Sequence, residues 1–196
     1  LKKNIPFGAG LGGGSADAAF TLKMLNELFS LQLSSVQLRA FAARLGADCP
    51  FFIDNQPAYA TGIGDLLEPF SVNLSGYMLL LVKPQDAVST KDAYSGIVPR
   101  DKRADINHVD LKVALRQPVD LWKETVVNDF EGSVFPAHPT IAAIKQQLYD
   151  CGATYAAMSG SGSTVFGLFN SMNESALAKA ESAFADTDYF LHGSKL

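Results

Sequence analysis

The spacing of apolar residues near the start of the chain predicts two helices. Residues 15–29 contain no Gly or Pro and are rich in Ala, Leu and Met, so we predict a helix there. We expect most of this helix to be buried, along a side formed by Ala19, Leu22, Leu25 and Phe29. A second helix is predicted after Ser34, where Ser34 and Gln37 match a capping box and apolar residues then recur at helical spacing as far as Gly46.

Short apolar runs bounded by turn residues predict strands, which alternate with further helical stretches. The predicted strands cover residues 58–61, 66–70, 77–82, 155–158, 164–169 and 189–192, and the end of another strand at residues 2–5. The other predicted helices cover residues 88–94, 109–116, 121–125, 139–151 and 175–184. The polar, charged segment 99–110 is predicted to be a mobile loop. This mixture of helices and strands indicates an α+β protein.

A glycine-rich loop precedes the first predicted helix. Five of the seven residues from Gly8 to Gly14 are glycine. Glycine tolerates φ > 0 and lets a ligand approach the backbone, and the N-terminus of the following helix favours anions. We therefore predict a cradle for nucleotide phosphates, formed by Pro6, Phe7, Gly8, Ala9, Gly10, Leu11, Gly12, Gly13, Gly14, Ser15 and Ala16.

Other glycine-rich motifs fit this loop less well. Residues 8–13 match the G-x-G-x-x-G fingerprint of dinucleotide-binding folds, but no strand follows before the second helix. Gly14 occupies the position before Ser15 where a Walker loop carries lysine. A protein-kinase loop lies in a hairpin and is followed by a strand rather than by a helix. Leu11 and the abrupt helical pattern after the loop argue against a flexible linker.

Asp48 is the candidate general base. We expect it in a non-helical turn, because Cys49 precedes Pro50 and a residue before proline is disfavoured in the α region. The neighbouring apolar residues Phe51 and Phe52 would partly desolvate the carboxylate, which suits a base. The same position also fits a helix cap or a surface acid. Cys49 is interpreted as a buried structural thiol rather than a nucleophile.

A second glycine-rich turn lies late in the chain, at Ser159–Ser163. It joins two predicted strands and offers backbone N–H donors without positive charge, although a simple hairpin turn has the same pattern. Thr90 and Tyr94 lie in the helix predicted to start near residue 88. From the residues alone, helix capping and core packing explain these two side chains as well as a ligand does.

The composition and charge of the chain argue against some classes of binding partner. The chain has 196 residues, a formal net charge of −4 and a pI near 5.3, which argues against a nucleic-acid surface. We find no apolar run of about 18 residues and no charged-then-apolar leader, so neither membrane spanning nor secretion is expected. The two cysteines are far apart in sequence and fit a cytoplasmic protein with reduced thiols, and the three histidines show no metal-ligand spacing.

Four stretches of the chain resemble the GHMP small-molecule kinases, at residues 6–17, 45–52, 60–65 and 159–166. Residues 128–131 are a further stretch that this family shows. The resemblance implies a two-domain α+β fold, in which residues 1–74 are the remainder of an N-terminal domain like domain 2 of ribosomal protein S5. Residues 75–196 would form a ferredoxin-like C-terminal domain, with the active site between the two domains.

The resemblance also implies roles for the candidate residues. It implies ATP and Mg²⁺ as cofactors, Ser15 as a Mg²⁺ ligand and Asp48 as the catalytic residue, although Ser15 is also a candidate N-cap. It places the substrate near Thr90, Tyr94, Gly160, Ser161 and Gly162. Residues 45–52 resemble most the family member that phosphorylates a cytidine-diphosphate alcohol in non-mevalonate isoprenoid biosynthesis. Another GHMP kinase such as mevalonate kinase, or a non-catalytic nucleotide-binding module, is the alternative.

The glycine-rich loop follows only a few residues after Leu1. GHMP kinases carry strands, a catalytic lysine and much of the substrate pocket ahead of this loop, so we expect a further segment upstream. Lys2 and Lys3 lie too close to the loop to replace that lysine. We therefore expect the chain by itself to be inactive as a kinase, and its oligomeric state stays open.

Overall fold

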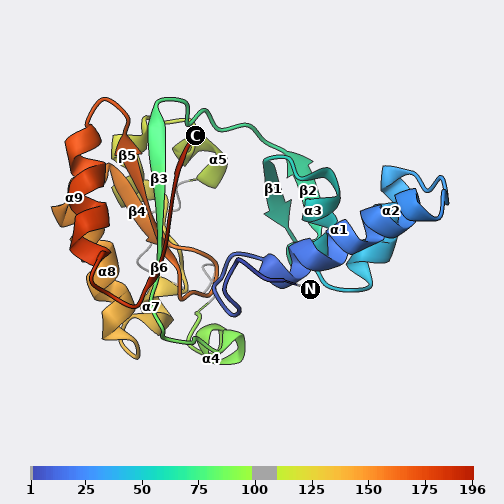
Figure 1. The fold of residues 1–196 in the computed structure, drawn as a ribbon, viewed down its shortest axis with the longest axis horizontal. Coiled ribbons are helices and arrows are strands. Elements are labelled where there is room, and N and C mark those ends of the chain that lie inside the picture. The colour runs from blue at the N-terminus through green and yellow to red at the C-terminus, as the bar shows by residue number, and fades with distance from the viewer. Residues whose placement is uncertain (1, 99–109) are drawn as a thin grey trace. The chain divides into compact units, whose positions relative to one another are not determined.

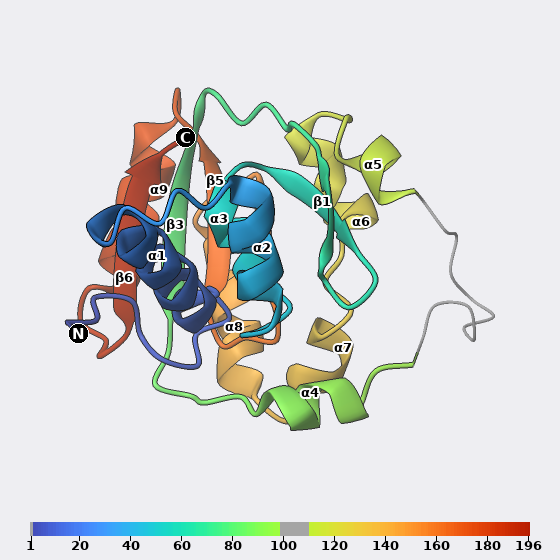
Figure 2. The ribbon, with the colours of Figure 1, turned by 90° about the vertical axis from the view of Figure 1, so that its right-hand side faces the viewer.

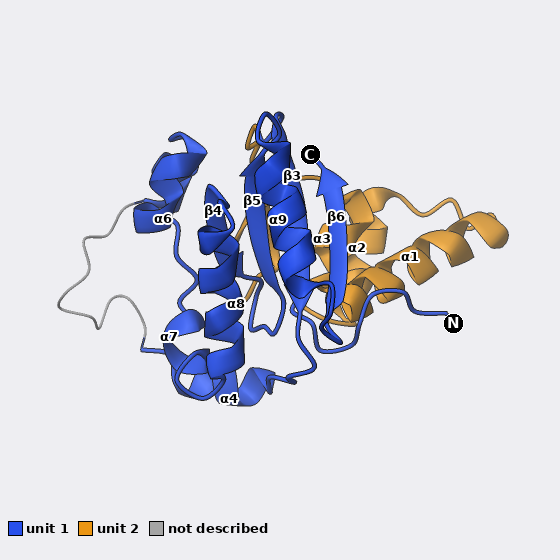
Figure 3. Ribbon diagram, turned by 60° about the vertical axis from the view of Figure 1, so that its left-hand side comes forward, with its two compact units in different colours: residues 1–11, 74–196 blue, residues 12–73 orange. Residues whose placement is uncertain are grey.

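The computed structural model describes residues 2–98 and 110–196 (Figure 1). The chain divides into two compact units, one made of Leu1–Leu11 with Leu74–Leu196 and the other of Gly12–Asn73 (Figure 3). Each unit has its own hydrophobic core. The predicted loop 99–110 lies outside the described residues except for Asp110. The division into domains after residue 74 remains a prediction.

The smaller unit, Gly12–Asn73, is described throughout and consists of helices followed by a hairpin. Its elements are α1 (Gly13–Leu28), α2 (Ser35–Ala43), α3 (Cys49–Asp54), β1 (Ala58–Thr61) and β2 (Leu66–Pro69). Strands β1 and β2 pair antiparallel, with Ala58 opposite Pro69. The predicted capping box of α2 is confirmed, since the side chain of Ser34 accepts from Gln37 N and the side chain of Gln37 accepts from Ser34 N.

The small core of this unit consists of Ala19, Leu38, Ala42, Cys49 and Ile53. Of the side of α1 that was expected to be buried, Ala19 is buried, but Leu25 is 36% exposed and Phe29 is 64% exposed. The expectation that most of α1 is buried is therefore wrong. A helix face is buried only where another element covers it, and within this unit α2 and α3 cover only the strip of α1 around Ala19.

Helix α3 lies outside the predicted elements and corrects the expectation for Cys49. Asp48 has helical dihedral angles (φ −82°, ψ −14°), and Cys49 is the first residue of α3. Proline is tolerated in the first helical turn because its missing N–H has no acceptor there, so Pro50 does not prevent the helix. The expected strand at residues 2–5 is also absent, because none of the described residues pairs with this segment in a ladder.

The larger unit contains a four-stranded antiparallel sheet with the strand order β4-β5-β3-β6 (Figure 3). Its strands are β3 (Tyr77–Lys83), β4 (Tyr155–Met158), β5 (Val165–Asn170) and β6 (Phe190–Lys195). Helices α8 (Pro139–Asp150) and α9 (Glu174–Phe184) pack on one face of the sheet (Figure 3). The chain order β-α-β-β-α-β is that of a ferredoxin-like domain, and it confirms the predicted α+β fold.

The core of the larger unit lies between its sheet and helices α8 and α9. Leu80 and Val82, two residues apart in β3, are both buried on this side, as expected from the side-chain period of a strand. On the other face of the sheet, the rings of Trp122 and Phe166 pack edge-to-face against Tyr155. The sheet is therefore covered by apolar side chains on both faces at β4.

Short helical segments connect β3 to α8 in the larger unit. They are α4 (Thr90–Ser95), α5 (Leu111–Ala114), the 3₁₀ turn η2 (Val119–Leu121), α6 (Trp122–Thr125) and α7 (Glu131–Val134). The helices predicted in this region are confirmed at shorter lengths, while α7 was not expected. Within residues 2–98 and 110–196, no helix combines the length and the apolar character that crossing a bilayer requires.

Candidate active site

The first half of the glycine-rich loop, residues 6–11, is held by the glycine-serine turn of the same unit. Thr164 N donates to Ala9 O at 3.2 Å, and Ser159 Oγ donates to Gly10 O at 2.8 Å. Gly10 has φ +70°, and a Cβ at this position would collide with Ser159 O. Only glycine fits there, so these two glycine-rich segments lie side by side although they are far apart in sequence.

The second half of the loop becomes the first turn of α1 in the smaller unit. Gly12 is the N-cap, with φ +64°, and has no side chain with which to cap the helix. The first backbone bond of the helix runs from Ala16 N to Gly12 O at 2.9 Å. The three preceding N–H groups have no acceptor within the helix, and they belong to Gly13, Gly14 and Ser15. Together with the dipole of a 16-residue helix, these donors favour an anion.

The glycines of the loop serve two different purposes. A Cβ built on Gly8 or on Gly14 would have no atom of the described residues within 4 Å. These positions leave room beside the backbone for a ligand. A Cβ on Gly12 would instead lie 2.8 Å from Phe52 Cζ, so this glycine permits close packing inside the smaller unit. Within the smaller unit, the open position at Gly14 and the free donors in the first turn of α1 fit a bound phosphate group.

Ser15 is the third residue of α1 and is half-buried. The interpretation of Ser15 as the N-cap is wrong, because Gly12 holds that position. Its role as a Mg²⁺ ligand remains a prediction. The part of the chain that the structure describes contains no group of three or more His, Cys, Asp or Glu side chains that could hold a metal ion. A metal ion bound near Ser15 would therefore depend on phosphate oxygens as well.

Asp48 lies beside a hollow of about 190 Å³ in the smaller unit. The residues that line it are Gly12, Asp48, Phe51, Phe52, Ala58, Ala60, Gly64 and Leu67. Asp48 occupies the N-cap position of α3, as the helix-cap interpretation expects, but its side chain makes no capping hydrogen bond. Asp48 is exposed although Phe51 and Phe52 line the same hollow, so the expected desolvation is wrong and the surface-acid alternative fits the structure. A Cβ on Gly64 would lie 3.3 Å from Asp48 Oδ1.

The turn Ser159–Ser163 joins β4 to β5 and contains two glycines with positive φ, Gly160 at +55° and Gly162 at +89°. Gly162 N donates to Ser159 O at 3.0 Å and closes the turn. Gly162 is buried, and a Cβ there would lie 2.8 Å from Met158 Sδ. Gly160 is exposed. A Cβ on Gly160 would lie 3.3 Å from Gly10 O, so the turn combines a buried glycine with an exposed one that packs closely against the glycine-rich loop.

Helix α4 carries the predicted substrate residues Thr90 and Tyr94. Its N-cap is Ser89, whose hydroxyl caps the helix, so the capping interpretation of Thr90 is wrong. Thr90 Oγ1 lies 3.4 Å from Ser161 Oγ, which places α4 beside the glycine-serine turn. Tyr94 is 63% exposed and meets Phe130 edge-to-face, with 4.8 Å between the ring centroids. The core-packing interpretation of Tyr94 is therefore also wrong.

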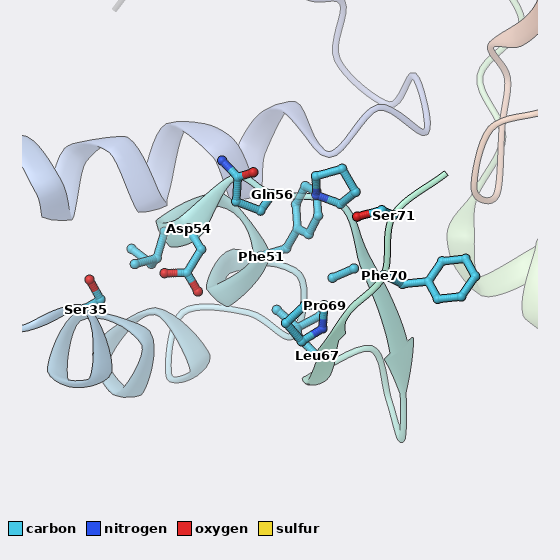
Figure 4. A pocket seen from close by; sticks show the side chains of 11 residues that line it. Ser35, Phe51, Asp54, Gln56, Leu67, Pro69, Phe70 and Ser71 are labelled. Carbon is cyan, nitrogen blue, oxygen red and sulfur yellow. The ribbon is translucent and has the colours of Figure 1, made fainter. Parts of the chain in front are cut away.

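The smaller unit contains a second and larger pocket, of about 670 Å³, that no sequence motif indicates (Figure 4). Its lining residues are Ser35, Phe51, Ile53, Asp54, Gln56, Pro57, Ala58, Leu67, Pro69, Phe70 and Ser71. They come from α2, α3 and the hairpin of β1 and β2. Asp54 at its edge accepts from Arg39 Nη1 at 2.6 Å. Among the described residues that line this pocket, none belongs to the glycine-rich loop.

Known families and curated relatives match most of the chain. The model of the GHMP kinases N terminal domain matches residues 1–62, and that of the GHMP kinases C terminal domain matches residues 111–186. A 4-diphosphocytidyl-2-C-methyl-D-erythritol kinase of Bacteroides fragilis is 54% identical over 184 residues, which are 94% of this chain and 65% of that protein. The kinase of the same name from Parabacteroides distasonis is 54% identical over 186 residues, 95% of this chain and 66% of that protein. The chain thus spans about 65% of the length of these relatives.

Solved structures show the same fold. The crystal structure of a 4-(cytidine 5'-diphospho)-2C-methyl-D-erythritol kinase has a TM-score of 0.77 and 31% identity, over 100% of this chain and 70% of that one. A homoserine kinase from Cytophaga hutchinsonii has a TM-score of 0.65 and 18% identity, over 98% of this chain and 67% of that one. The family models, the identities and the fold agree, and the chain therefore belongs to the GHMP kinase family.

Proposed function

We propose that the chain belongs to an ATP-dependent kinase that phosphorylates the 2-hydroxyl of 4-diphosphocytidyl-2-C-methyl-D-erythritol in non-mevalonate isoprenoid biosynthesis. The observation that carries the proposal is the glycine-rich loop that leads into the uncapped N-terminus of α1. The relatives that are 54% identical over most of the chain support the choice of substrate. The reaction would take place in the cytoplasm on a small molecule, with neither nucleic acid nor membrane as a partner.

The glycine-rich loop would hold the phosphates of ATP. The N–H groups in the first turn of α1 and the helix dipole stabilise negative charge. The open space beside Gly8 and Gly14 gives the phosphates room. Mg²⁺, when bound, neutralises part of the phosphate charge, and the hydroxyl of Ser15 would be its ligand from this chain. Positioning and charge stabilisation of this kind are the main requirements of phosphoryl transfer.

The acceptor would be bound and activated by residues that the structure leaves accessible. Asp48 would accept or orient the proton of the attacking hydroxyl, and its exposed carboxylate is open to a substrate. The exposed ring of Tyr94 and the hydroxyl of Thr90 would bind the cytidine-diphosphate alcohol. Residues 160–162 would lie near the substrate, and among them Ser161 N–H would face the phosphates of ATP.

Two other interpretations make different predictions. Another GHMP kinase, such as mevalonate kinase, would share the loop and Asp48 but prefer a different acceptor. A non-catalytic nucleotide-binding module would bind ATP and transfer no phosphate to any alcohol. An acid near a polyphosphate would only weaken simple binding, because like charges repel, so the presence of Asp48 favours an enzyme.

The test is a phosphate-acceptor assay on the protein at the full length of its relatives. We expect phosphorylation of the cytidine-diphosphate alcohol and not of mevalonate. Asp48→Asn should leave ATP affinity within about threefold and lower turnover by roughly 10² to 10⁴. Asp54→Asn is the matched control, because Asp54 at the other end of α3 is also an exposed acid but pairs with Arg39 and does not line the hollow.

Each other outcome contradicts a defined part of the proposal. Near-normal turnover of Asp48→Asn would remove Asp48 from the mechanism. Phosphorylation of mevalonate in place of the cytidine-diphosphate alcohol would reassign the substrate within the family. ATP binding without transfer to any acceptor would support the non-catalytic module, and a full-length protein that binds no ATP would refute the proposal as a whole.

A further inference from the structure

The side-chain amide of Asn128 is bonded at both of its ends. Its Nδ2 donates to Met158 O and to Gly160 O, at 2.7 Å in each case. Its Oδ1 accepts from Phe130 N at 3.0 Å. These bonds determine which way the amide faces, because rotation by 180° would place its oxygen against two carbonyl oxygens. Asn128 therefore holds the start of the turn Ser159–Ser163 from one side.

The bond to Gly160 O sets the orientation of the peptide group between Gly160 and Ser161. In a trans peptide the C=O and the N–H point in opposite directions. Because Gly160 O points at Asn128, Ser161 N–H points away from it. Gly160 has φ +55° and no Cβ that would restrict this peptide, and the bond from Asn128 Nδ2 restrains it. A rotated peptide would present a carbonyl oxygen in place of an N–H and would repel an anion.

Glu131, at the start of α7, holds the residue that precedes the turn. Its Oε1 accepts from Met158 N at 2.8 Å, and its Oε2 accepts from Lys145 Nζ at 2.6 Å. The side chain of Glu131 is 13% exposed and that of Lys145 is 25% exposed. Charge-assisted bonds of this kind restrict geometry strongly when water is largely excluded. Both backbone polar groups of Met158 are thus bonded to side chains of residues 128–131.

The same part of the chain also packs against α4 (Figure 2). Ser133 Oγ donates to Ala93 O at 2.9 Å, and the ring of Phe130 meets the ring of Tyr94. A Cβ on Gly96 would lie 2.5 Å from Ser133 Cβ, so the end of α4 approaches α7 more closely than any other residue type at position 96 would allow. The position of Tyr94 is therefore set from this side.

We propose that four side chains form a positioning platform for both substrates of the kinase: Asn128, Phe130, Glu131 and Ser133. At one end of the platform, Asn128 fixes the turn so that Ser161 N–H is presented to a phosphate group. At the other end, Phe130 fixes Tyr94 for the acceptor. This inference rests on the proposed kinase function. The platform residues act through the turn and through α4 rather than by touching the reacting atoms.

Asn128→Asp tests the nucleotide end of the platform. Aspartate keeps the acceptor for Phe130 N but loses both donors and sets a negative charge against two carbonyl oxygens. In the full-length protein we expect KM for ATP to rise roughly tenfold and KM for the cytidine-diphosphate alcohol to stay within about twofold. Asn170→Asp is the matched control, because Asn170 Oδ1 accepts from Met172 N at 2.9 Å and keeps that bond after the change. The control should alter neither constant.

Phe130→Leu tests the acceptor end. Leucine keeps an apolar side chain but loses the edge-to-face contact with Tyr94. We expect KM for the cytidine-diphosphate alcohol to rise by about threefold to tenfold, with KM for ATP unchanged. A platform that served folding alone would lower the melting temperature and move both constants together in both variants. That result would overturn the inference.

The amide ¹H–¹⁵N resonance of Ser161 in the full-length protein without ligand is a readout that does not depend on catalysis. Asn128→Asp should shift it, and Asn170→Asp should not. An unchanged Ser161 resonance in Asn128→Asp would show that Asn128 does not determine the orientation of the peptide group between Gly160 and Ser161. This result would overturn the inference even in an active kinase. Failure of the proposed function appears separately, as a parent protein that binds no ATP, and it would remove the catalytic role of the platform as well.

Discussion

Tyr155 is a buried tyrosine whose hydroxyl donates to Val126 O at 2.9 Å. Burial raises the pKa of Tyr155 above its ordinary value, and the nearby charges of Glu131 and Tyr149 raise this pKa further. Burial also raises the pKa of Tyr149, and the nearby carboxylates of Glu131 and Glu124 raise it further. The folded protein therefore holds both phenolic protons more tightly than the unfolded chain does.

We expect the free energy of unfolding to fall as the pH rises above about 10. There the tyrosines of the unfolded chain ionise while Tyr155 stays neutral in the folded protein, so the unfolded state binds fewer protons and is favoured. Below the unfolded pKa the stabilising contribution is fully present. Urea unfolding at a series of pH values measures the fall, and Tyr155→Phe should make it less steep. An equally steep fall in Tyr155→Phe would contradict this account.

Ser163 and Thr164 are neighbouring buried residues with different hydrogen bonding. Ser163 Oγ donates to Asp86 O at 2.6 Å, whereas Thr164 Oγ1 has no partner among the residues that the structure describes. We expect Ser163→Ala to lower the free energy of unfolding by about 1 kcal/mol, because it leaves a carbonyl unbonded. Thr164→Val should be neutral or stabilising, because valine has the same shape without the unpaired hydroxyl. Urea unfolding measures the free energy of unfolding of both variants. An equal loss in the two would contradict the different hydrogen bonding of Ser163 and Thr164.

At the level of elements, a substitution of Gly14 in the first turn of α1 should have opposite effects on the stability of the protein and on its affinity for ATP. A Cβ there meets no described atom within 4 Å, so Gly14→Ala should stabilise the helix by about 0.5–1 kcal/mol. If the proposed phosphate cradle is right, the same methyl group would occupy the space assigned to the phosphates, and ATP affinity should fall roughly tenfold. Thermal unfolding and ATP titration of the full-length protein measure the two effects.

Gly132→Ala is the control for this experiment, since Gly132 lies in α7 and a Cβ there would also meet no described atom within 4 Å. It should stabilise the protein slightly without changing ATP affinity. If Gly14→Ala binds ATP as the parent does, Gly14 is not part of the phosphate cradle. If Gly132→Ala weakens ATP binding equally, the effect does not arise from the loop.

The elements that could be predicted are those with a local signal. The capping box of Ser34 and Gln37 and the apolar run of β3 depend on residues that are close in sequence. Helix α3 has no such signal, because six residues with a proline in the first turn form a helix only when Cys49 and Ile53 are packed in the core. The burial of α1 could not be predicted, because periodicity shows which side is apolar but not what covers it.

The candidate site likewise contains some features that the sequence predicts and others that depend on the fold. Composition was sufficient to identify the glycine-rich loop and the glycine-serine turn, because glycine enrichment is a property of the sequence itself. The bond from Ser159 Oγ to Gly10 O could not be predicted, since it depends on the fold that places these segments together. The exposure of Asp48 and the bonds of Asn128 are likewise consequences of packing, and no spacing rule indicates them.

At the scale of the whole molecule, the two compact units differ in the size of their cores. Among the described residues, the core cluster of the smaller unit contains five buried residues, whereas that of the larger unit contains sixteen. Each fully buried aliphatic or aromatic side chain contributes about 1.5–3 kcal/mol. Helix α1 also leaves large apolar side chains exposed, among them Phe20, Met24 and Leu28. The smaller unit should therefore be the less stable of the two.

We expect this chain to unfold in urea in two steps, with the smaller unit first. Trp122 is the single tryptophan of the sequence. It is buried in the larger unit and its Nε1 donates to Gln117 O at 3.0 Å, so its fluorescence reports on that unit. Part of the helical circular dichroism, from α1, α2 and α3, should be lost at lower urea concentrations than the native fluorescence of Trp122.

Two core variants show which unit unfolds in each step of the urea transition. Leu38→Ala removes a core side chain of the smaller unit and should lower only the first midpoint, while Ile144→Ala in the larger unit should lower only the second. Each change should cost about 2–5 kcal/mol in the unit that contains it. If circular dichroism and fluorescence change together in the parent, and each variant shifts both signals equally, the chain unfolds as one cooperative body. The difference in core size would then not determine the order of unfolding, because coupling between the units would outweigh it.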